Sequence, residues 1–450
     1  MMSILSILVS AAVVLGVLYV LYDTRWVIVL LMVMFPLEQL IASYVPLFAA
    51  NPKLFNLLIG VLAVVALASR FIRGHRLSLG MLNPVSVLIW LIYIKAAVGI
   101  LHTPGPEMAT SYMLFGLPYY VLMLLILPLL LYDLHEFRRL IRLLLWMGSV
   151  ITILILVNPN TSYYSGRFTI DLGMQAGKEG AGSVLALGTL GGMLAIASVF
   201  FRPDPGRFFD QIIRLVAFVC GLGLAIGTGS RGQVLAAIVT CILFYPVARP
   251  VRDVRQFFAT AFGVLILIIG FMFTFSLFVS ELNRERWAPV DMVASIQTRF
   301  DFIAILFFEY LSHPLSWLFG LGTAAFEALE SKVYVHNLIV EMLCEQGLVG
   351  LLLLTGTIYY AWRYGVGLLR THQHDPQSRA TVTIILAFGF YWLMIAMKQG
   401  SFLLSPEIFL WFLIVAKLAI VDAAQETWVI DETPEEPEII PIGRIAPPVL

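Results

Sequence analysis

Charged residues are scarce in this sequence of 450 residues: Asp, Glu, Lys and Arg make up 12% of it, whereas hydrophobic residues make up 60%. Soluble globular domains are roughly 25% charged and 45–50% apolar. So few charges cannot cover a water-facing surface, which excludes both an ordinary soluble domain and a disordered chain. The composition predicts an all-α bundle that crosses a lipid membrane many times.

Cysteine and metal-binding patterns are also sparse. The three cysteines, Cys220, Cys241 and Cys344, lie inside apolar runs with no CxxC or Cys/His spacing, so we expect buried apolar side chains rather than disulfides or a zinc site. The predicted outer loops hold no DxD-like acidic cluster, which disfavours a metal-dependent sugar transferase because divalent metals prefer carboxylate oxygens. Walker A, GxGxxG and GxSxG motifs do not occur in a supporting context, and we expect no metal, no cofactor and no nucleic-acid partner.

Long apolar runs predict the membrane-spanning helices, each of which needs about 17–25 residues. Thirteen candidates have the approximate ranges 3–22, 26–45, 54–72, 83–101, 112–132, 140–158, 182–201, 211–227, 232–248, 256–279, 338–362, 380–398 and 407–421. Only Asp23-Thr24-Arg25 separates the first two, and Pro36 and Glu38 interrupt the second. Twelve spans therefore remain an alternative to thirteen.

The arrangement of arginines predicts which loops face the cytoplasm, because positive charge is enriched on that side of a membrane. Five connections that alternate with the others carry three arginines each: 70/73/76, 138/139/142, 202/207/214, 249/252/255 and 363/370/379. After the transmembrane domain, 1–421, the segment 422–450 has seven acidic residues against one arginine and is rich in proline. It is predicted to be a disordered cytoplasmic tail.

Two of the remaining outer loops are long. The first covers about 159–181, and the second covers 280–337. Within the second, 292–311 has a strong apolar face interrupted by Arg299, Asp301 and Glu309. This pattern predicts an amphipathic helix at the outer membrane interface, with a short extra span as the alternative.

The basic residues of the outer loops are not explained by topology, and Arg231 is the most informative of them. It follows glycines in Gly227-Thr-Gly-Ser-Arg-Gly232, a short turn between two spans. Glycine lets a ligand approach the backbone closely, and Ser230 is expected to cap the helix that begins at Arg231. A helix N-terminus with an arginine can hold a phosphate group.

Other outer residues could share such a site. Arg299 lies on the predicted amphipathic helix, and Arg167 follows two tyrosines in Tyr163-Tyr-Ser-Gly-Arg167, a context that suits a sugar phosphate. The weaker candidates are Lys178, Arg284, Arg286, Lys332 and Lys398.

His336 is the histidine expected at the outer end of a span. It can accept a proton from a sugar hydroxyl near neutral pH. Asn337 can cap the helix that follows, and Glu341 lies one turn further on, at a membrane depth where charges usually face the bundle interior.

Three segments in order resemble motifs of one family. The stretch Val335–Gly350, with His336-Asn337 and Glu345-Gln-Gly347, is similar to the "HN…E.G..G" segment of the O-antigen ligase/polymerase superfamily of bacterial envelope glycosyltransferases. His313-Pro…Gly320-Leu-Gly322 resembles the family's "HP…G.G" turn, and Gly229–Gly232 resembles its "SRG" motif. The resemblance covers about 160–350.

This resemblance implies a helical bundle of the glycosyltransferase C type in the bacterial inner membrane, with its active groups on the periplasmic face. The implied donor is a glycan on undecaprenyl pyrophosphate, and transfer is metal-independent and inverting. Arg231 and Arg299 would hold the pyrophosphate, His336 would activate the acceptor hydroxyl, and Arg167, Lys178, Ser230, Asn337 and Glu341 would help to bind substrate.

The sequence does not identify the acceptor of the glycan. Lipid A–core would make the chain a ligase, a growing polysaccharide would make it a polymerase, and a protein side chain would make it an oligosaccharyltransferase. A transporter or flippase of a polyprenyl-linked sugar is the alternative from another class, which predicts broken helices in repeated halves.

Overall fold

The computed structural model of the chain describes residues 19, 22–74, 80–164, 166–175, 178–181, 183–249, 253–279, 281–284, 287–330, 334–399 and 401–431. It is mostly helical, which confirms the predicted class. The predicted first span, 3–22, lies almost wholly outside the described residues. So does most of the predicted tail, 432–450.

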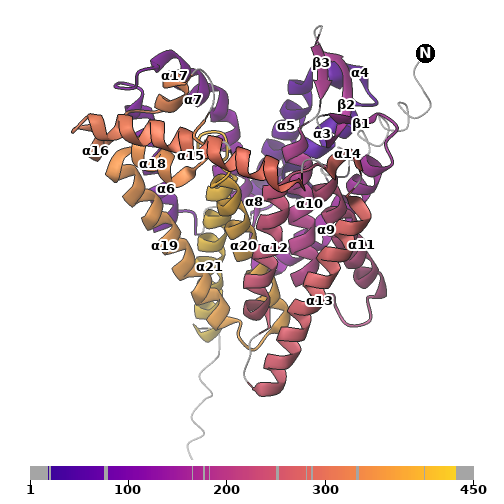
Figure 1. The fold of residues 1–450 in the computed structure, drawn as a ribbon. Coiled ribbons are helices and arrows are strands. Elements are labelled where there is room, and N and C mark those ends of the chain that lie inside the picture. The colour runs from indigo at the N-terminus through magenta and orange to yellow at the C-terminus, as the bar shows by residue number, and fades with distance from the viewer. Residues whose placement is uncertain are drawn as a thin grey trace, which may run out of the picture.

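Most helices follow one another with short connections, and a small sheet separates α9 from α10 (Figure 1). In chain order they are α2 (Arg25–Met32), α3 (Met34–Ala42), α4 (Pro46–Ala50), α5 (Pro52–Ile72), α6 (Pro84–Gly99), α7 (Pro106–Tyr120), the π-helix η1 (Val121–Ile126), α8 (Leu127–Leu130), α9 (Leu134–Leu156), α10 (Val184–Phe200), α11 (Phe208–Gly227), α12 (Arg231–Ala248), α13 (Val254–Phe278), α14 (Glu281–Arg284), α15 (Pro289–Ser312), α16 (Ser316–Phe319), α17 (Ala325–Leu329), α18 (Leu338–Cys344), α19 (Gly347–Thr371), α20 (Pro376–Ala396) and α21 (Glu407–Asp431). Many begin with proline, whose missing N–H costs nothing at the first helical position.

Among the described residues, seven helices are long and apolar enough to cross a membrane: α5, the continuous α7–η1–α8, α9, α11, α12, α13 and α20. An eighth is added if α2 and α3, which meet at a bend of 76°, form one broken span. This number is below the predicted twelve or thirteen because several apolar runs form shorter elements. The predicted spans 83–101 and 182–201 correspond to α6, of 16 residues, and α10, of 17 residues.

The predicted span 338–362 is broken in two. α18 ends at Cys344 and α19 begins at Gly347. Gly347 has a φ of +72°, which is the left-handed backbone that glycine adopts without strain. A hydropathy profile does not reveal this break, because most residues before Glu345 and after Gln346 are apolar.

The outer loop predicted at 159–181 contains a three-stranded antiparallel sheet, which departs from a purely helical fold. Its strands are β1 (Thr161–Tyr164), β2 (Arg167–Gln175) and β3 (Lys178–Ala181). Tyr164 pairs with Arg167 and Gln175 pairs with Lys178, so two residues separate the paired ends of each pair of neighbouring strands. At the other end of the chain, α21 continues to Asp431, beyond the predicted end of the last span at 421.

The two ends of the bundle differ in what they carry. Arg231 is the first residue of α12 and Arg249 follows its last, while α20 has Arg379 in its first turn and Lys398 just after its end. We call the end with Arg231 and Lys398 the α15 end, because α15 runs crosswise over the bundle there (Figure 1). α15 confirms the helix predicted at 292–311. The side of the membrane that each end faces stays a prediction.

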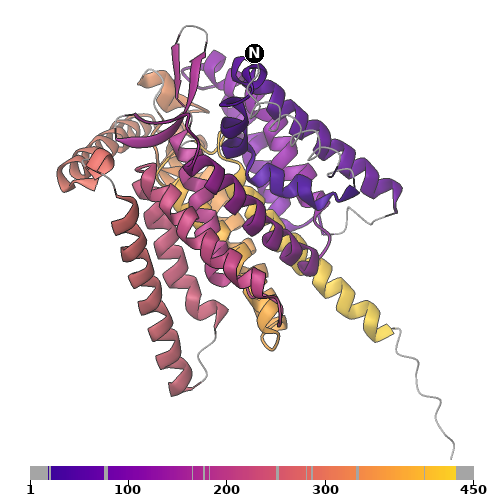
Figure 2. The ribbon, with the colours of Figure 1, turned by 90° about the vertical axis from the view of Figure 1, so that its right-hand side faces the viewer.

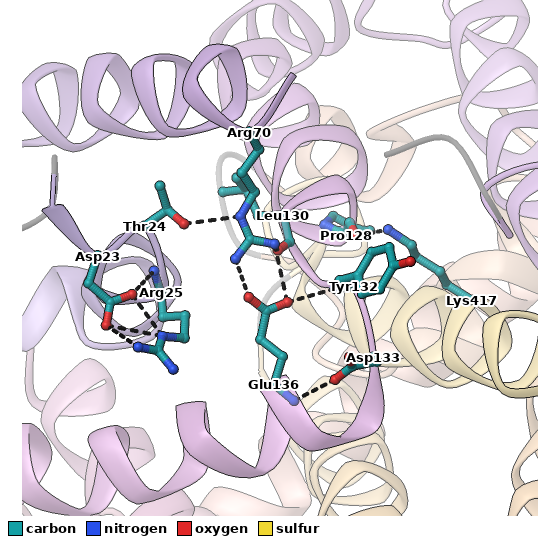
Figure 3. Close-up of polar contacts among 10 residues, drawn as sticks. All are labelled: Asp23, Thr24, Arg25, Arg70, Pro128, Leu130, Tyr132, Asp133, Glu136 and Lys417. Carbon is teal, nitrogen blue, oxygen red and sulfur yellow. Dashed lines mark hydrogen bonds and ion pairs between the residues drawn. The ribbon is translucent and has the colours of Figure 1, made fainter. Parts of the chain in front are cut away.

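At the opposite end, Arg70 is buried in a polar network rather than exposed to a lipid surface (Figure 3). Its guanidinium forms an ion pair with Glu136 and donates to the hydroxyl of Thr24 at 3.0 Å. Glu136 also accepts from the backbone N–H of Tyr132 at 2.8 Å, and Lys417 donates to the carbonyl of Pro128 at 2.7 Å. Arg70 thus fastens α5 to α9, and Lys417 fastens α21 to α8, so the arginine that marks topology in the sequence is also structural.

Candidate functional site

Arg231 stands at the start of α12, after a turn in which Gly229 has a φ of +61°. Ser230 occupies the N-cap position, but the expected side-chain cap is wrong. The hydroxyl of Ser230 is buried and donates instead to the carbonyl of Val184 at 3.3 Å. A Cβ at Gly188 would lie 2.8 Å from that hydroxyl oxygen, so α10 packs tightly against the turn.

Lys398 reaches the same helix start from the connection between α20 and α21. Its Nζ donates to Oε1 of Gln233 at 3.0 Å. Gln233 is fully buried, and its amide nitrogen donates to Oε1 of Gln399 at 2.7 Å. The aliphatic part of Lys398 passes over Gly232, where a Cβ would come within 2.0 Å of its Cδ. The ammonium group is therefore held at the first turn of α12, the helix that begins with Arg231.

His336 lies within reach of two of these positive charges. Burial, and then the charges of Arg299 and Lys398, lower the pKa of its imidazole to about 4. His336 has a φ of +57°, a left-handed conformation that is strained for any residue with a side chain and that tends to mark functional positions. Its Nδ1 is buried and has no hydrogen-bond partner among the described residues.

Arg299 completes the group from α15. Burial, followed by the charge of Arg231, lowers the pKa of its guanidinium. Arg231, Arg299 and Lys398, which we call the cation cluster, come from three separate elements. Arg231 acts on Arg299, and Arg299 and Lys398 act on His336. A group of positive charges of this kind attracts anions.

Asn337 and Glu341 have structural partners. The side chain of Asn337 caps α18, accepting from the N–H groups of Ile339 and Val340 at 3.1 and 3.2 Å. The buried carboxylate of Glu341 accepts from the hydroxyl of Ser401 and from the N–H of Phe402. Glu341 therefore fixes the connection that carries Lys398, which gives it a positioning role in the site.

The glycines of two motifs form one tight seam behind His336. The N–H of Leu321 donates to the carbonyl of Cys344 at 2.8 Å, and that of Gly322 to the carbonyl of Glu345 at 3.0 Å. A Cβ at Gly320 would lie 2.1 Å from the carbonyl oxygen of Glu345. The Glu345 carboxylate in turn accepts from two N–H groups at the start of α17, at 2.9 and 3.1 Å. This seam sets the position of α18 and hence of His336.

The other predicted residues lie on the small sheet, on α14 or outside the described residues. Arg167 begins β2, and its neighbour Phe168 is buried beside the turn, 3.8 Å from where a Cβ of Gly227 would lie. Lys178 lies on β3, where only the backbone is described. Arg284 is exposed on α14, and Arg286 and Lys332 lie outside the described residues.

Lys398 is a candidate site residue to which sequence reasoning gives too little weight. A lysine at the end of a predicted span is usually a side chain that extends to the lipid headgroups. Only the packing of Gly232 and Gln233 against it separates the two roles.

Comparison with known proteins agrees with the motifs that place these residues. No curated protein matches the chain. Residues 216–355 match the family described as Wzy_C, O-Antigen ligase, a segment that includes Arg231, Arg299 and His336. The resemblance read from the sequence is confirmed over this segment, and the chain is a membrane protein whose residues 216–355 match an O-antigen ligase family domain.

Proposed function

We propose that this protein transfers a glycan from undecaprenyl pyrophosphate to an acceptor hydroxyl, with its site on the periplasmic face of the inner membrane. The observation that carries the proposal is that Arg299 and Lys398 act on His336, while Arg231 acts on Arg299. The family match adds that lipid-linked glycans are the substrates expected of such a domain.

The cation cluster would bind the pyrophosphate of the donor. Guanidinium groups pair with phosphate oxygens through two parallel hydrogen bonds, and the ammonium of Lys398 adds a point charge. The first turn of α12 offers backbone N–H groups and a partial positive charge beside Arg231. These groups would stabilise the charge that develops on the pyrophosphate as it leaves.

His336 would act as the base. The acceptor oxygen forms a bond to the anomeric carbon while the bond from that carbon to the pyrophosphate oxygen breaks. The acceptor proton passes to the imidazole. The pyrophosphate, still attached to its lipid carrier, leaves with the bonding electrons on the oxygen that held the anomeric carbon. A single displacement of this kind inverts the anomeric centre.

The low pKa of His336 ties its basicity to the donor. Without an anion, burial and neighbouring positive charge keep the imidazole neutral but make it a weak base. A bound pyrophosphate would offset that charge and raise the pKa of His336. The base would therefore become strong only when the leaving group is in place, which limits futile chemistry.

The decisive experiment is transfer by purified protein in detergent, with a glycan on undecaprenyl pyrophosphate as donor and lipid A–core as acceptor. We expect His336→Ala to lower kcat about 10²–10⁴-fold and Arg231→Ala to lower it about 10²–10³-fold. His135→Ala and Arg139→Ala are matched controls, because both residues are exposed on α9. Full activity in either site variant would refute the assignment.

The same assay separates a transferase from a transporter. A break such as that between α2 and α3 is a feature of transporters. A pure transporter moves its substrate without covalent change, however, and detergent removes the compartments it needs. Product formed in detergent would exclude that alternative, and polysaccharide or protein acceptors in parallel reactions would identify the acceptor class.

A further inference from the structure

A second basic cluster lies at the opposite end of the bundle, away from the cation cluster. It surrounds a pocket of about 680 Å³ between α12, α13, the start of α20 and the connection from α10 to α11. Its polar lining includes Arg202, Arg249, Gln256, Thr260, His374 and Arg379. The glycan-transfer proposal gives this pocket no role.

The arginines of this pocket are fixed in place by the end of α12. Arg202 donates to the carbonyl of Ala248 at 3.4 Å, and Arg379 donates to that of Val247 at 2.8 Å. Arg249 stacks over the ring of Tyr245 at 5.0 Å while remaining exposed. These contacts orient three guanidinium groups around one space without neutralising their charge.

The charge of the pocket is incompletely compensated. Burial, and then the charge of Arg249, lower the pKa of Arg202. Within the described residues, neither Arg202 nor Arg249 forms an ion pair with a carboxylate. At the same end of the bundle, by contrast, Arg138 and Arg142 both pair with Asp204 at 2.5 Å.

The nearest acidic side chains are already used to start helices. Asp253 caps α13 by accepting from the N–H of Gln256 at 2.7 Å. Asp375 caps α20 by accepting from two N–H groups at 2.9 and 3.2 Å, and its charge raises the pKa of Arg202 by less than that of Arg249 lowers it. The pocket therefore has the chemistry of an anion site.

The wall formed by α13 indicates what carries the anion. Only 11% of the most apolar 18-residue stretch of α13 is buried, and Figure 2 shows α13 standing apart from the other helices. Ala259 lines the pocket, and Ile266, two turns further along the same face of α13, is 53% exposed. In a membrane, hydrocarbon chains would cover this surface directly beside the arginines.

We propose that the pocket binds the phosphate headgroup of an anionic phospholipid whose acyl chains lie along α13. Basic pockets between transmembrane helices suit such headgroups, since the arginines meet the phosphate while the adjoining helix meets the chains. A bound lipid would bridge α13 to α12 and α20 and so fasten a helix that has little protein around it.

The test is lipid binding to the full-length protein in detergent, measured by native mass spectrometry with cardiolipin, phosphatidylglycerol and zwitterionic phosphatidylethanolamine. We expect the two anionic lipids to bind in preference, and Arg249→Ala to weaken them about fivefold. Arg249→Lys should restore most of the binding. Arg139→Ala removes an exposed arginine at the same end, outside the pocket, and should leave binding unchanged.

Three outcomes would overturn the proposal. One is equal binding of zwitterionic and anionic lipids. Another is an equal effect of Arg139→Ala and Arg249→Ala, which would indicate only general surface attraction. The third is displacement of the lipid by inorganic phosphate at matched concentration, which would make this a site for a free anion. Because Arg249 is exposed, its variants should fold, and a melting curve without added lipid checks this.

Discussion

Lys398 lies directly across Gly232: a Cβ at position 232 would come within 2.0 Å of the lysine Cδ and 2.6 Å of its Nζ. The lysine chain occupies the space that any other residue at 232 would fill. The glycine that follows Arg231 therefore admits a second positive charge to the start of α12. This gives a physical reason for the glycine of the "SRG" motif.

Gly232→Ala should displace Lys398 without disturbing the bundle, because the atoms that must move belong to the end of a flexible side chain. We expect weaker donor binding, seen as a donor KM raised about tenfold, as for the loss of one charged hydrogen bond. Lys398→Ala should have a similar effect. The measurement is donor KM and kcat in the detergent transfer assay.

The double variant Gly232→Ala/Lys398→Ala makes this test specific. If the glycine acts through the lysine, the two effects overlap and the double variant resembles Lys398→Ala alone. Additive losses would contradict that relationship. Gly60→Ala is a matched control in α5, since nothing lies within 4 Å of a Cβ there.

His336 should stay neutral at pH values where an ordinary histidine is protonated. Its pKa of about 4 lies below the usual value of 6.5, so the free imidazole gains its proton only as the pH falls towards 4. We expect kcat/KM, which reports the free enzyme, to show no decline from His336 between pH 7 and 5. The pH profile of the detergent assay and the ring nitrogen shifts of labelled histidine measure this.

Removing a neighbouring charge should move this titration upwards. Lys398→Met eliminates one of the two positive charges that lower the pKa of His336, so the acid limb of the profile should shift towards pH 6.5. The difference between the spectra of the protein and of His336→Gln identifies the correct ring. An unchanged titration in Lys398→Met would show that Lys398 does not act on the imidazole.

Glu341 should affect the site through the connection it holds. Glu341→Ala leaves the hydroxyl of Ser401 and the N–H of Phe402 buried without their acceptor, which costs about 1–3 kcal/mol per group. We expect a lower melting temperature together with a higher donor KM, because Lys398 lies on that connection. Glu341→Gln keeps one acceptor and should be milder on both measures.

A direct substrate contact by Glu341 predicts a different pattern. The melting temperature of Glu341→Ala would then stay near that of the unaltered protein while donor or acceptor KM rises. Ser401→Ala separates the cases independently, since it breaks the same clamp without touching the carboxylate. If the clamp is the role of Glu341, Ser401→Ala should raise donor KM as well.

The features that follow from local patterns were predictable from the sequence. Seven of the predicted apolar runs locate the seven long apolar helices, the apolar face of 292–311 locates α15, and Asn337 before an apolar run locates the start of α18. Each signal is contained in a few consecutive residues. Arg231 and His336 were identifiable for the same reason, because their motifs are short and contiguous.

The features that depend on contacts between distant segments were not predictable. Ser230 is a suitable cap by type, but α10 offers its hydroxyl the carbonyl of Val184 instead. The role of Lys398 depends on Gly232 and Gln233, more than 160 positions away. The small sheet at 161–181 likewise depends on pairing between its strands, which the order of polar and apolar residues in this segment does not predict.

Gly347→Ala should destabilise the protein, whereas Gly367→Ala in the same helix should not. Gly347 has a φ of +72°, and a Cβ there would lie 2.3 Å from the backbone carbonyl oxygen of Leu318, which cannot move aside like a side chain. Backbone strain of this kind costs about 1–3 kcal/mol, before the clash is counted. At Gly367, nothing lies within 4 Å of a Cβ, and alanine favours a helix interior by up to about 1 kcal/mol. Thermal melting in detergent compares the two, and equal melting temperatures would show that the seam does not fix the break before α19.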